Sequence, residues 1–265
     1  MQRDQPLGTW ALKLEQLMRQ AGAAAMAHFG SSEFQTKEDF TPVTAADRAS
    51  EEVLVAGLER LFPEDSIVSE EGGGRERSNS RCWYVDPIDG TAAFVEGLAH
   101  WGPVVGCLDE NGPSVGAVFM PRTGDYFFAV RGEGAWLNGE RLARLEGGPV
   151  DRRSVVYVPS RFHQYVEFDF EGKLRSLGGT AAHLVLVASG SAVGTMVPAG
   201  WKLWDVVGPF CLLKEVGAEV AGQLNPALDL RRHPTQAFAV GHPSLLQTHF
   251  SPSRFRMRNR RNSDG

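Results

Sequence analysis

Near the start of the chain, apolar residues recur every three or four positions, which is the spacing of amphipathic helices. One stripe predicts a helix over residues 9–28, and a second predicts a helix from Thr44 to just before Pro63. Thr44 suits the N-cap of the second helix, and Asp47 occupies the acidic position of a capping box. The two stripes consist of Trp10, Leu14, Leu17, Ala21 and Ala24, and of Leu54, Leu58 and Leu61.

Two short apolar runs then predict buried strands that lead directly into acidic residues. Residues 66–69 form the first run and precede Glu70 and Glu71. Residues 82–85 form the second run and precede Asp86. Each strand is therefore expected to deliver a carboxylate at its end.

The rest of the chain alternates between strand-like and helix-like patterns. Residues 101–137 contain apolar runs separated by turn residues and predict a meander. The second half predicts strands near 154–158, 192–197 and 236–240, and helices near 180–189 and 205–216. Gly217 suits the end of the last helix, and Gly72–Asn79 suits a flexible loop. This mixture predicts a layered α/β (α+β) architecture.

Composition supports an ordinary globular protein. The chain has 265 residues, of which 42% are hydrophobic and 22% charged, and this length suits one large unit or two closely joined ones. A net charge of -5 argues against a surface built for nucleic acid or an anionic membrane. The N-terminus lacks the form of a signal peptide, and no apolar run reaches the roughly 18 residues of a membrane span.

The basic C-terminus and the cysteines each allow more than one interpretation. Residues 254–261 contain five arginines, which suit either a phosphate- or nucleic-acid-binding tail or a solvated, disordered terminus, and the second is favoured. Cys82, Cys107 and Cys211 are widely spaced within apolar runs. They are expected to be reduced core residues, not disulfides or zinc ligands, in a reducing cytoplasm.

The segment 83–91 carries the most informative pattern. An apolar strand delivers Asp86, Pro87 stiffens the following turn, and Asp89 comes three residues after Asp86. In a tight turn both carboxylates can face one point, and Gly90 allows a ligand to approach the backbone closely. The alternative for this pattern alone is a surface turn.

Backbone amides after this turn add a second chemical feature. The amides of Gly90, Thr91 and Ala92 would lie at a helix N-terminus, where phosphate groups bind readily. Asp205 opens another predicted helix, where an aspartate alone is more often a structural N-cap.

Taken together and in order, these motifs resemble those of the inositol monophosphatase family and of the wider lithium-sensitive, magnesium-dependent phosphatases. The resemblance covers nearly the whole chain. The matching motifs are Pro42-Val-Thr-Ala-Ala-Asp47, Glu70-Glu71, Asp86-Pro-Ile-Asp89-Gly-Thr91, Gly132–Gly139, Gly179-Thr-Ala-Ala182 and Trp204-Asp205-x-x-Gly208.

The resemblance implies a five-layer α-β-α-β-α sandwich of the inositol monophosphatase and sugar phosphatase type. Residues 1–145 would form an N-terminal α+β half that carries Glu70 and the Asp86–Thr91 motif. Residues 146–252 would form a C-terminal α/β half with Asp205, followed by the basic tail at 253–265.

Clustered carboxylates repel one another unless protons or cations neutralise them. Oxygen donors without Cys or His favour Mg²⁺, with Mn²⁺ as a substitute. The resemblance implies that Glu70, Asp86 and the carbonyl of Ile88 hold one ion, and that Asp86, Asp89 and Asp205 hold a second. A third, weaker ion would bind near Glu70.

The resemblance also implies direct hydrolysis of a phosphate monoester by a metal-activated water. No phosphoenzyme is expected, because these motifs contain no candidate Cys or His nucleophile. Glu70 and Thr91 would lie beside that water, and Asp47 would accept a hydrogen bond from the Thr91 hydroxyl. The implied substrate contacts are Asp89, Gly90, Thr91, Ala92, Ala181 and Lys202.

The substrate itself stays open. Pro198 stands seven positions before Asp205, where inositol-cleaving members have an acid that binds sugar hydroxyls, so inositol specificity is in doubt. Lys202 suits a second anionic group or simple exposure, Trp201 suits stacking or packing, and His183 suits a pocket wall or a structural role. Candidate substrates are inositol phosphates, sugar phosphates, histidinol phosphate, fructose 1,6-bisphosphate and nucleoside 3′,5′-bisphosphates.

Other classes of protein remain as alternatives. A binding or regulatory protein could retain the fold without catalysis, although no implied metal ligand is missing. A nucleic-acid-associated protein acting through the arginine tail would bind with strong salt dependence. The resemblance further implies a homodimer.

Overall fold

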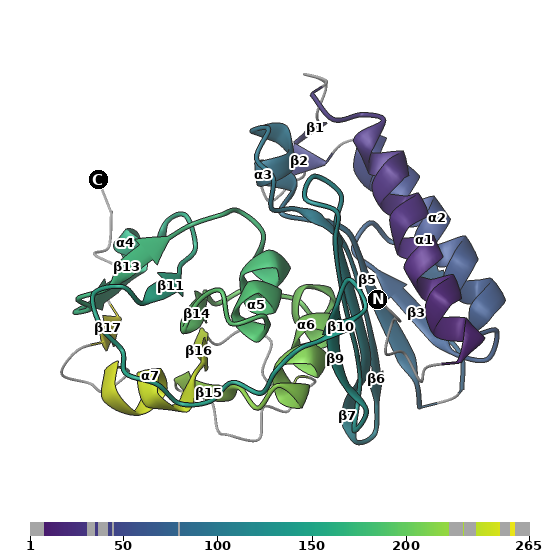
Figure 1. The fold of residues 1–265 in the computed structure, drawn as a ribbon. Helices are drawn as coiled ribbons and strands as arrows, with labels where there is room; N and C mark the ends of the chain where they lie inside the picture. Colours follow the sequence, from purple (N-terminus) through teal and green to yellow (C-terminus); the bar gives the residue numbers. More distant parts are fainter. Residues whose placement is uncertain are drawn as a thin grey trace.

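A computed structural model describes residues 8–30, 35–36, 42–43, 45–78, 80–222, 230, 237–249 and 255–257. The described chain is layered (Figure 1). Two N-terminal helices cover one face of a large sheet, two central helices separate it from a smaller sheet, and a C-terminal helix lies beyond the smaller sheet. The five-layer α-β-α-β-α arrangement implied by the sequence resemblance is thus confirmed.

The large sheet has eight strands in the order β10-β9-β8-β7-β6-β5-β3-β4. Only β3 and β5 run parallel, and the other neighbours are antiparallel. The predicted meander forms its centre. The strands are β3 Ser66–Ser69, β4 Gly74–Arg75, β5 Cys82–Asp89, β6 Gly102–Asp109, β7 Gly112–Met120, β8 Asp125–Val130, β9 Gly134–Leu137 and β10 Glu140–Arg141.

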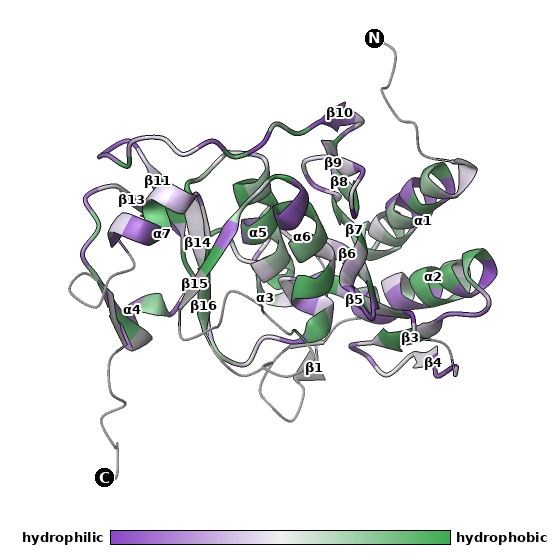
Figure 2. Cartoon of the chain, turned by 90° about the horizontal axis from the view of Figure 1, so that it is seen from below, coloured by the Kyte–Doolittle hydropathy of each residue, from purple (hydrophilic) through white to green (hydrophobic). Residues whose placement is uncertain are grey.

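Helices α1 (Thr9–Met26) and α2 (Ala45–Leu61) pack on the outer face of this sheet. Leu14 and Leu54 from the predicted stripes are fully buried there, against strand residues such as Trp83. Figure 2 shows hydrophobic and hydrophilic residues on different sides of these two helices. The two amphipathic helices are confirmed, whereas the proposed cap at Thr44 lies outside the described residues.

Helices α5 (Thr180–Ala188) and α6 (Leu203–Glu215) lie between the two sheets. The smaller sheet has the strand order β13-β11-β14-β16-β15. Helix α7 (Pro243–His249) packs on its other face. Its strands are β11 Val155–Tyr157, β13 Lys173–Arg175, β14 Gly194–Val197, β15 Glu219–Gly222 and β16 Phe238–Gly241. The predicted central helices and the strands at β11, β14 and β16 are confirmed.

Two segments differ from the sequence-based expectations. Gly74–Arg75, within the expected flexible loop, pairs with β3, because the edge of that strand offers free backbone groups. Phe255–Met257, within the expected disordered tail, pairs with Val166–Phe168 in a separate two-stranded sheet; the other tail residues lie outside the described chain. The remaining short elements are β1 Gln35–Thr36, β2 Pro42–Val43, α3 Thr91–Val95, α4 Phe162–Tyr165, β12 Val166–Phe168 and β17 Phe255–Met257.

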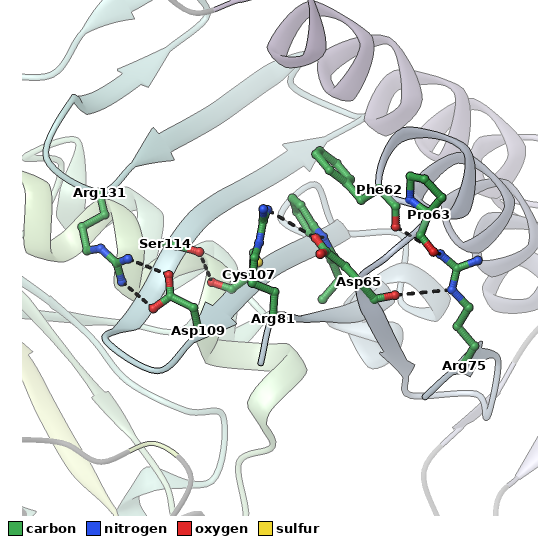
Figure 3. A network of polar contacts seen from close by, with 10 residues as sticks. Phe62, Pro63, Asp65, Arg75, Arg81, Cys107, Asp109, Ser114 and Arg131 are labelled. Atoms are coloured by element: carbon green, nitrogen blue, oxygen red, sulfur yellow. Dashed lines mark hydrogen bonds and ion pairs between the residues drawn. The ribbon is translucent and has the colours of Figure 1, made fainter. Parts of the chain in front are cut away.

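A polar network fixes the turn between α2 and β3 (Figure 3). Buried Asp65 accepts a hydrogen bond from Trp83 Nε1 at 2.9 Å and forms an ion pair with Arg81 at 3.3 Å. Arg75 donates to the carbonyls of Phe62 and Pro63 at 3.0 and 2.7 Å. Strand β3 begins directly after this turn and ends directly before Glu70.

The state of the cysteines and the character of the helices agree with the expectations from the sequence. Cys107 and Cys211 are buried, Cys82 is half-buried, and all three are free thiols. Among the described residues, no helix combines the length and apolar character needed to cross a bilayer.

Candidate active site

A bulge at the end of β5 places two aspartates next to each other. Asp86 pairs with Val104 and Asp89 pairs with Gly102, so three steps along β5 match only two along β6. Asp86 Oδ1 accepts a hydrogen bond from the backbone amide of Ile88 at 2.9 Å, which tightens the turn. Both carboxylates are buried, with 3% and 5% of each residue exposed.

Acidic residues from separate parts of the chain converge on this bulge. Burial raises the pKa of Asp86 well above its ordinary value, and repulsion from Glu70, Asp89, Asp205 and Asp47 raises it further. These acids come from the end of β3, the end of β5, the first turn of α6 and the first turn of α2. The structure therefore brings together every acidic residue proposed from the sequence.

Burial and mutual repulsion disfavour the charged form of three carboxylates in this acidic cluster, Asp86, Asp89 and Asp205. Burial, followed by repulsion from Asp205, raises the pKa of Asp89 to about 8, although three backbone amides oppose the rise. Burial raises the pKa of Asp205 to about 7, and repulsion from Glu70 adds to the rise. The cluster therefore has a strong tendency to take up protons or other cations near neutral pH.

Two of the acids are turned toward helix N-termini. The Thr180 amide donates to Asp89 Oδ1 at 3.1 Å, and the Ala181 and Ala182 amides donate to Oδ2 at 2.9 and 3.3 Å. Asp205 Oδ2 accepts a hydrogen bond from the backbone amide of Lys202 at 2.8 Å. These carboxylates gain the favourable interaction of an anion with a helix N-terminus.

This arrangement explains a second observation about metal binding. In the part of the chain that the structure describes, no three His, Cys, Asp or Glu side chains are arranged to hold an ion as they stand. The chemistry of the donors nevertheless fits a hard divalent cation, because burial and repulsion between neighbouring carboxylates raise the pKa values of Asp86 and Asp89, and a bound cation would offset that repulsion. Ion binding would require Asp89 or Asp205 to share its oxygens or to turn.

The backbone amides of Thr180, Ala181 and Ala182, which together form an amide clamp on Asp89, were not predicted as a contact from the sequence. The segment that contains them, Gly179–Ala182, was recognised only as a family motif, with Ala181 assigned to the substrate. In the structure the Ala181 side chain is buried and its amide binds Asp89. A side chain at Gly179 would collide with Asp89 Oδ2, so this glycine is the sequence signal that marks the contact.

Helix α3 begins directly after Asp89. Gly90 is its N-cap, with φ of 83°, and no side chain caps the helix. A Cβ at Gly90 would lie 2.9 Å from Gly179 Cα, so the first turns of α3 and α5 are in close contact. Thr91 is half-buried and Ala92 is exposed, which leaves this helix start accessible from solvent.

The Thr91 hydroxyl connects this turn to α2. Its Oγ1 lies 3.5 Å from Asp47 Oδ1 and 3.2 Å from the carbonyl oxygen of Ile88, and it is a hydrogen-bond donor to both. Asp47 is almost completely buried. The contact between Thr91 and Asp47 that the family resemblance implied is therefore present, although it is long.

The residues that the sequence offered as substrate contacts or pocket walls differ in their exposure to solvent. Lys202 is exposed beside Asp205, and Pro198 is half-buried after β14. Trp201 is buried, with its ring edge-on to Phe238 at 5.7 Å, so it packs in the core. His183 is buried and bonded to the backbone, which is the structural alternative allowed by the sequence.

Comparison with known families is consistent with this geometry. A family model described as the inositol monophosphatase family matches residues 9–247. The chain therefore belongs to the inositol monophosphatase family, and its class is that of the phosphoric monoester hydrolases.

Individual relatives support the same class. A histidinol-phosphatase of Mycobacterium tuberculosis is 40% identical over 245 residues, which are 87% of this chain and 92% of the relative. A histidinol-phosphatase of Chlorobaculum parvum is 30% identical over 212 residues, which are 76% of this chain and 81% of the relative. The solved structure of inositol monophosphatase II from Staphylococcus aureus has a TM-score of 0.73 at 25% identity, covering 90% of this chain and 94% of that one.

Proposed function

We propose that the protein is a magnesium-dependent phosphomonoesterase that hydrolyses a small phosphorylated metabolite, with histidinol phosphate as the first candidate substrate. The observation that carries this proposal is the acidic cluster, in which burial and mutual repulsion raise the pKa values of Asp86, Asp89 and Asp205. The cluster lies beside the uncapped start of α3, where backbone amides favour an anion such as phosphate.

In this proposal Glu70, Asp86 and the Ile88 carbonyl hold one Mg²⁺, and Asp86, Asp89 and Asp205 hold a second. The ions, when bound, would supply positive charge that neutralises the carboxylates and polarises water and phosphate oxygens. Mn²⁺, which shares the preference for oxygen ligands, is the expected substitute.

The protein's own groups have distinct roles in the proposed reaction. The amides of Gly90, Thr91 and Ala92 bind the phosphate oxygens at the start of α3. Asp47 orients the Thr91 hydroxyl by accepting its hydrogen bond, and the carboxylate would take up the hydroxyl proton as the hydroxyl oxygen takes one from water. Glu70 faces the same water.

Two observations favour histidinol phosphate over an inositol phosphate. The relative with 40% identity, which the chain covers nearly completely, is named a histidinol-phosphatase. Pro198 offers no side-chain acceptor for a sugar hydroxyl, so a polyol substrate would lose a hydrogen bond. Inositol phosphates, sugar phosphates, fructose 1,6-bisphosphate and nucleoside 3′,5′-bisphosphates remain as alternatives for the same site.

The test is a phosphate-release assay with the purified protein and this panel of substrates. We expect release that requires Mg²⁺, partly recovers with Mn²⁺, stops with EDTA, and is fastest with histidinol phosphate. Release from no member of the panel, under any metal condition, would overturn the proposed activity and favour a non-catalytic binding protein.

Asp89→Asn is the matched test of the acidic cluster. We expect it to reduce magnesium-dependent hydrolysis by at least about a hundredfold, because a bound divalent ion contributes several kcal/mol to such reactions. Asp169→Asn makes the same chemical change at an exposed position and should leave the rate unchanged. A near wild-type rate for Asp89→Asn would refute the ligand assignment.

The family resemblance also supports a homodimer and inhibition by lithium as parts of this proposal. Sedimentation velocity tests the first, and phosphate release in the presence of LiCl, with NaCl as the control, tests the second.

A further inference from the structure

His183 is a buried polar side chain that has no role in the proposed reaction. Only 3% of the residue is exposed, and its ring stacks on Tyr157 with centroids 5.2 Å apart and planes 5° from parallel. Its Nε2 accepts a hydrogen bond from the backbone amide of Leu177 at 2.9 Å. The buried His183 ring therefore fixes the position of the Leu177 backbone amide.

The ring is suited to act as a permanent acceptor. An Nε2 that accepts a hydrogen bond carries no proton, so the ring is the neutral tautomer protonated on Nδ1. Burial, with a smaller contribution from His100, lowers the pKa of His183 to about 4. The contact with Leu177 is therefore available at any pH near neutrality.

The backbone held by His183 is the turn formed by residues 177–179. Its other side is held by the N-terminal half of the chain, because the Gly179 amide donates to the carbonyl of His100 at 3.3 Å. Gly178 also forms a parallel bridge with His100. The turn is thus fixed between α5 on one side and the segment that precedes β6 on the other.

The same turn leads directly into the amide clamp on Asp89. Gly179 lies against Asp89 Oδ2, and the next three residues supply the amides that bind this carboxylate. A shift of the turn would therefore move the clamp and reorient Asp89.

We propose that His183 is a positioning residue: by holding the Leu177 amide it fixes the turn at 177–179 and thereby sets the orientation of Asp89 for divalent-ion binding. This inference rests on the proposed function, because it assigns Asp89 to the ion site. It predicts an effect on ion affinity that is separate from any effect on the chemical step.

Two substitutions distinguish the effect of the hydrogen-bond acceptor of His183 from the effect of its aromatic ring. His183→Phe keeps an aromatic ring against Tyr157 and removes the acceptor. His183→Gln removes the ring and keeps an acceptor, because Gln Oε1 and His Nε2 are both three bonds from Cβ. Should the Phe variant not fold, His183→Leu makes the same comparison without the acceptor.

Three measurements are made on the full-length protein: calorimetric Mg²⁺ binding, the Mg²⁺ concentration for half-maximal phosphate release, and amide hydrogen exchange at 177–182 without metal. For His183→Phe we expect Mg²⁺ affinity to fall about tenfold or more, as for groups that orient metal ligands. Exchange should accelerate, while kcat at saturating Mg²⁺ stays near wild type. His183→Gln should recover most of the affinity.

Val187→Ala is the matched control, because it loosens the packing of α5 about one turn further on without touching the turn at 177–179. It should lower thermal stability and leave Mg²⁺ affinity unchanged. Wild-type Mg²⁺ affinity in His183→Phe, or an equal loss in His183→Gln or Val187→Ala, would overturn the positioning role. Failure of the wild type to bind Mg²⁺ would instead overturn the proposed function, and amide exchange would still report on the turn.

Discussion

At the scale of single residues, the Thr91 hydroxyl has two acceptors and one proton to give. The hydroxyl proton is shared between Asp47 and the Ile88 carbonyl, so the orientation of the hydroxyl depends on the buried Asp47 carboxylate. If Thr91 accepts a proton from water as proposed, its hydroxyl is required and its methyl group is not.

We therefore expect Thr91→Val to lower kcat by about a hundredfold or more, which is the usual contribution of general acid–base groups. Thr91→Ser keeps the hydroxyl and should stay within about tenfold of wild type. Steady-state phosphate release with saturating Mg²⁺ measures both variants. Equal rates for the two variants would exclude the hydroxyl from the chemistry.

Sequence reasoning found the acids but not the contacts that orient them. Asp86 and Asp89 were predictable because a strand, a proline turn and a glycine are local features. The clamp on Asp89 joins residues 91 to 93 positions apart, and no local pattern encodes such a contact. His183 is similar, since its sequence position allowed a buried role but did not reveal its partner Leu177.

At the scale of elements, α6 packs directly on the large sheet, and this close packing determines the position of Asp205. A Cβ on Gly208 of α6 would lie 2.5 Å from the carbonyl oxygen of Val105. Side chains at Gly106 or Gly116 on the facing strands would collide with the Gly208 backbone. Because Asp205 lies one turn before Gly208, any lift of the helix would move this carboxylate.

Gly116→Ala is expected to destabilise the protein by about 1–3 kcal/mol, the usual effect of overpacking. It should also weaken Mg²⁺ binding, although Gly116 belongs to no proposed site. Urea denaturation and calorimetry check the two effects. Gly148→Ala, where a Cβ meets no atom within 4 Å, should stay within about 0.5 kcal/mol of wild type. An unchanged free energy of unfolding for Gly116→Ala would show that the close packing of α6 on the sheet does not constrain the helix.

The longer elements were predictable, and several of the short ones were not. Helices α1 and α2 have several turns of apolar spacing, and the meander has turn residues between its strands, so local patterns suffice. The strands β13 and β17 have three residues each, and each pairs with a strand far from it in sequence. Local sequence cannot reveal a partner of that kind.

At the scale of the whole molecule, the acidic cluster couples folding to pH. Without metal, the folded protein keeps protons on Asp89 and Asp205 near neutral pH, because their pKa values are about 8 and about 7. In the unfolded chain an aspartate has released its proton above its ordinary value of 3.8. The folded state therefore binds more protons, and its stability falls as pH rises through 7 and 8.

We expect the free energy of unfolding in EDTA to decrease between pH 6.5 and 8.5, by up to about 1.4 kcal/mol per pH unit for each proton. His183, with its pKa lowered to about 4, acts in the opposite direction but only below pH 6.5. Mg²⁺ should remove most of the decrease. Urea denaturation across this range, with and without Mg²⁺, gives the result; a rise in stability with pH in EDTA would contradict the charge state assigned to the cluster.

The layered fold was predictable as a whole only through the resemblance of several motifs in order. Alternating helices and strands indicated α/β layers, but the number of layers depends on which strands pair. The large sheet draws its strands from 66–141 and the smaller sheet from 155–241, and α5 and α6 fill the space between them. Their position brings Asp205 and the clamp on Asp89 to the end of β5.

The central claim is that the acidic cluster, with Glu70, Asp86, Asp89 and Asp205 as ligands, is a cation site. Calorimetric titration of Mg²⁺ into the metal-free protein at pH 7, in buffers of different ionisation enthalpy, tests it directly. We predict saturable binding with net release of protons, and loss of both in Asp86→Asn. Absence of binding, or binding that neither releases protons nor depends on Asp86, would contradict the account.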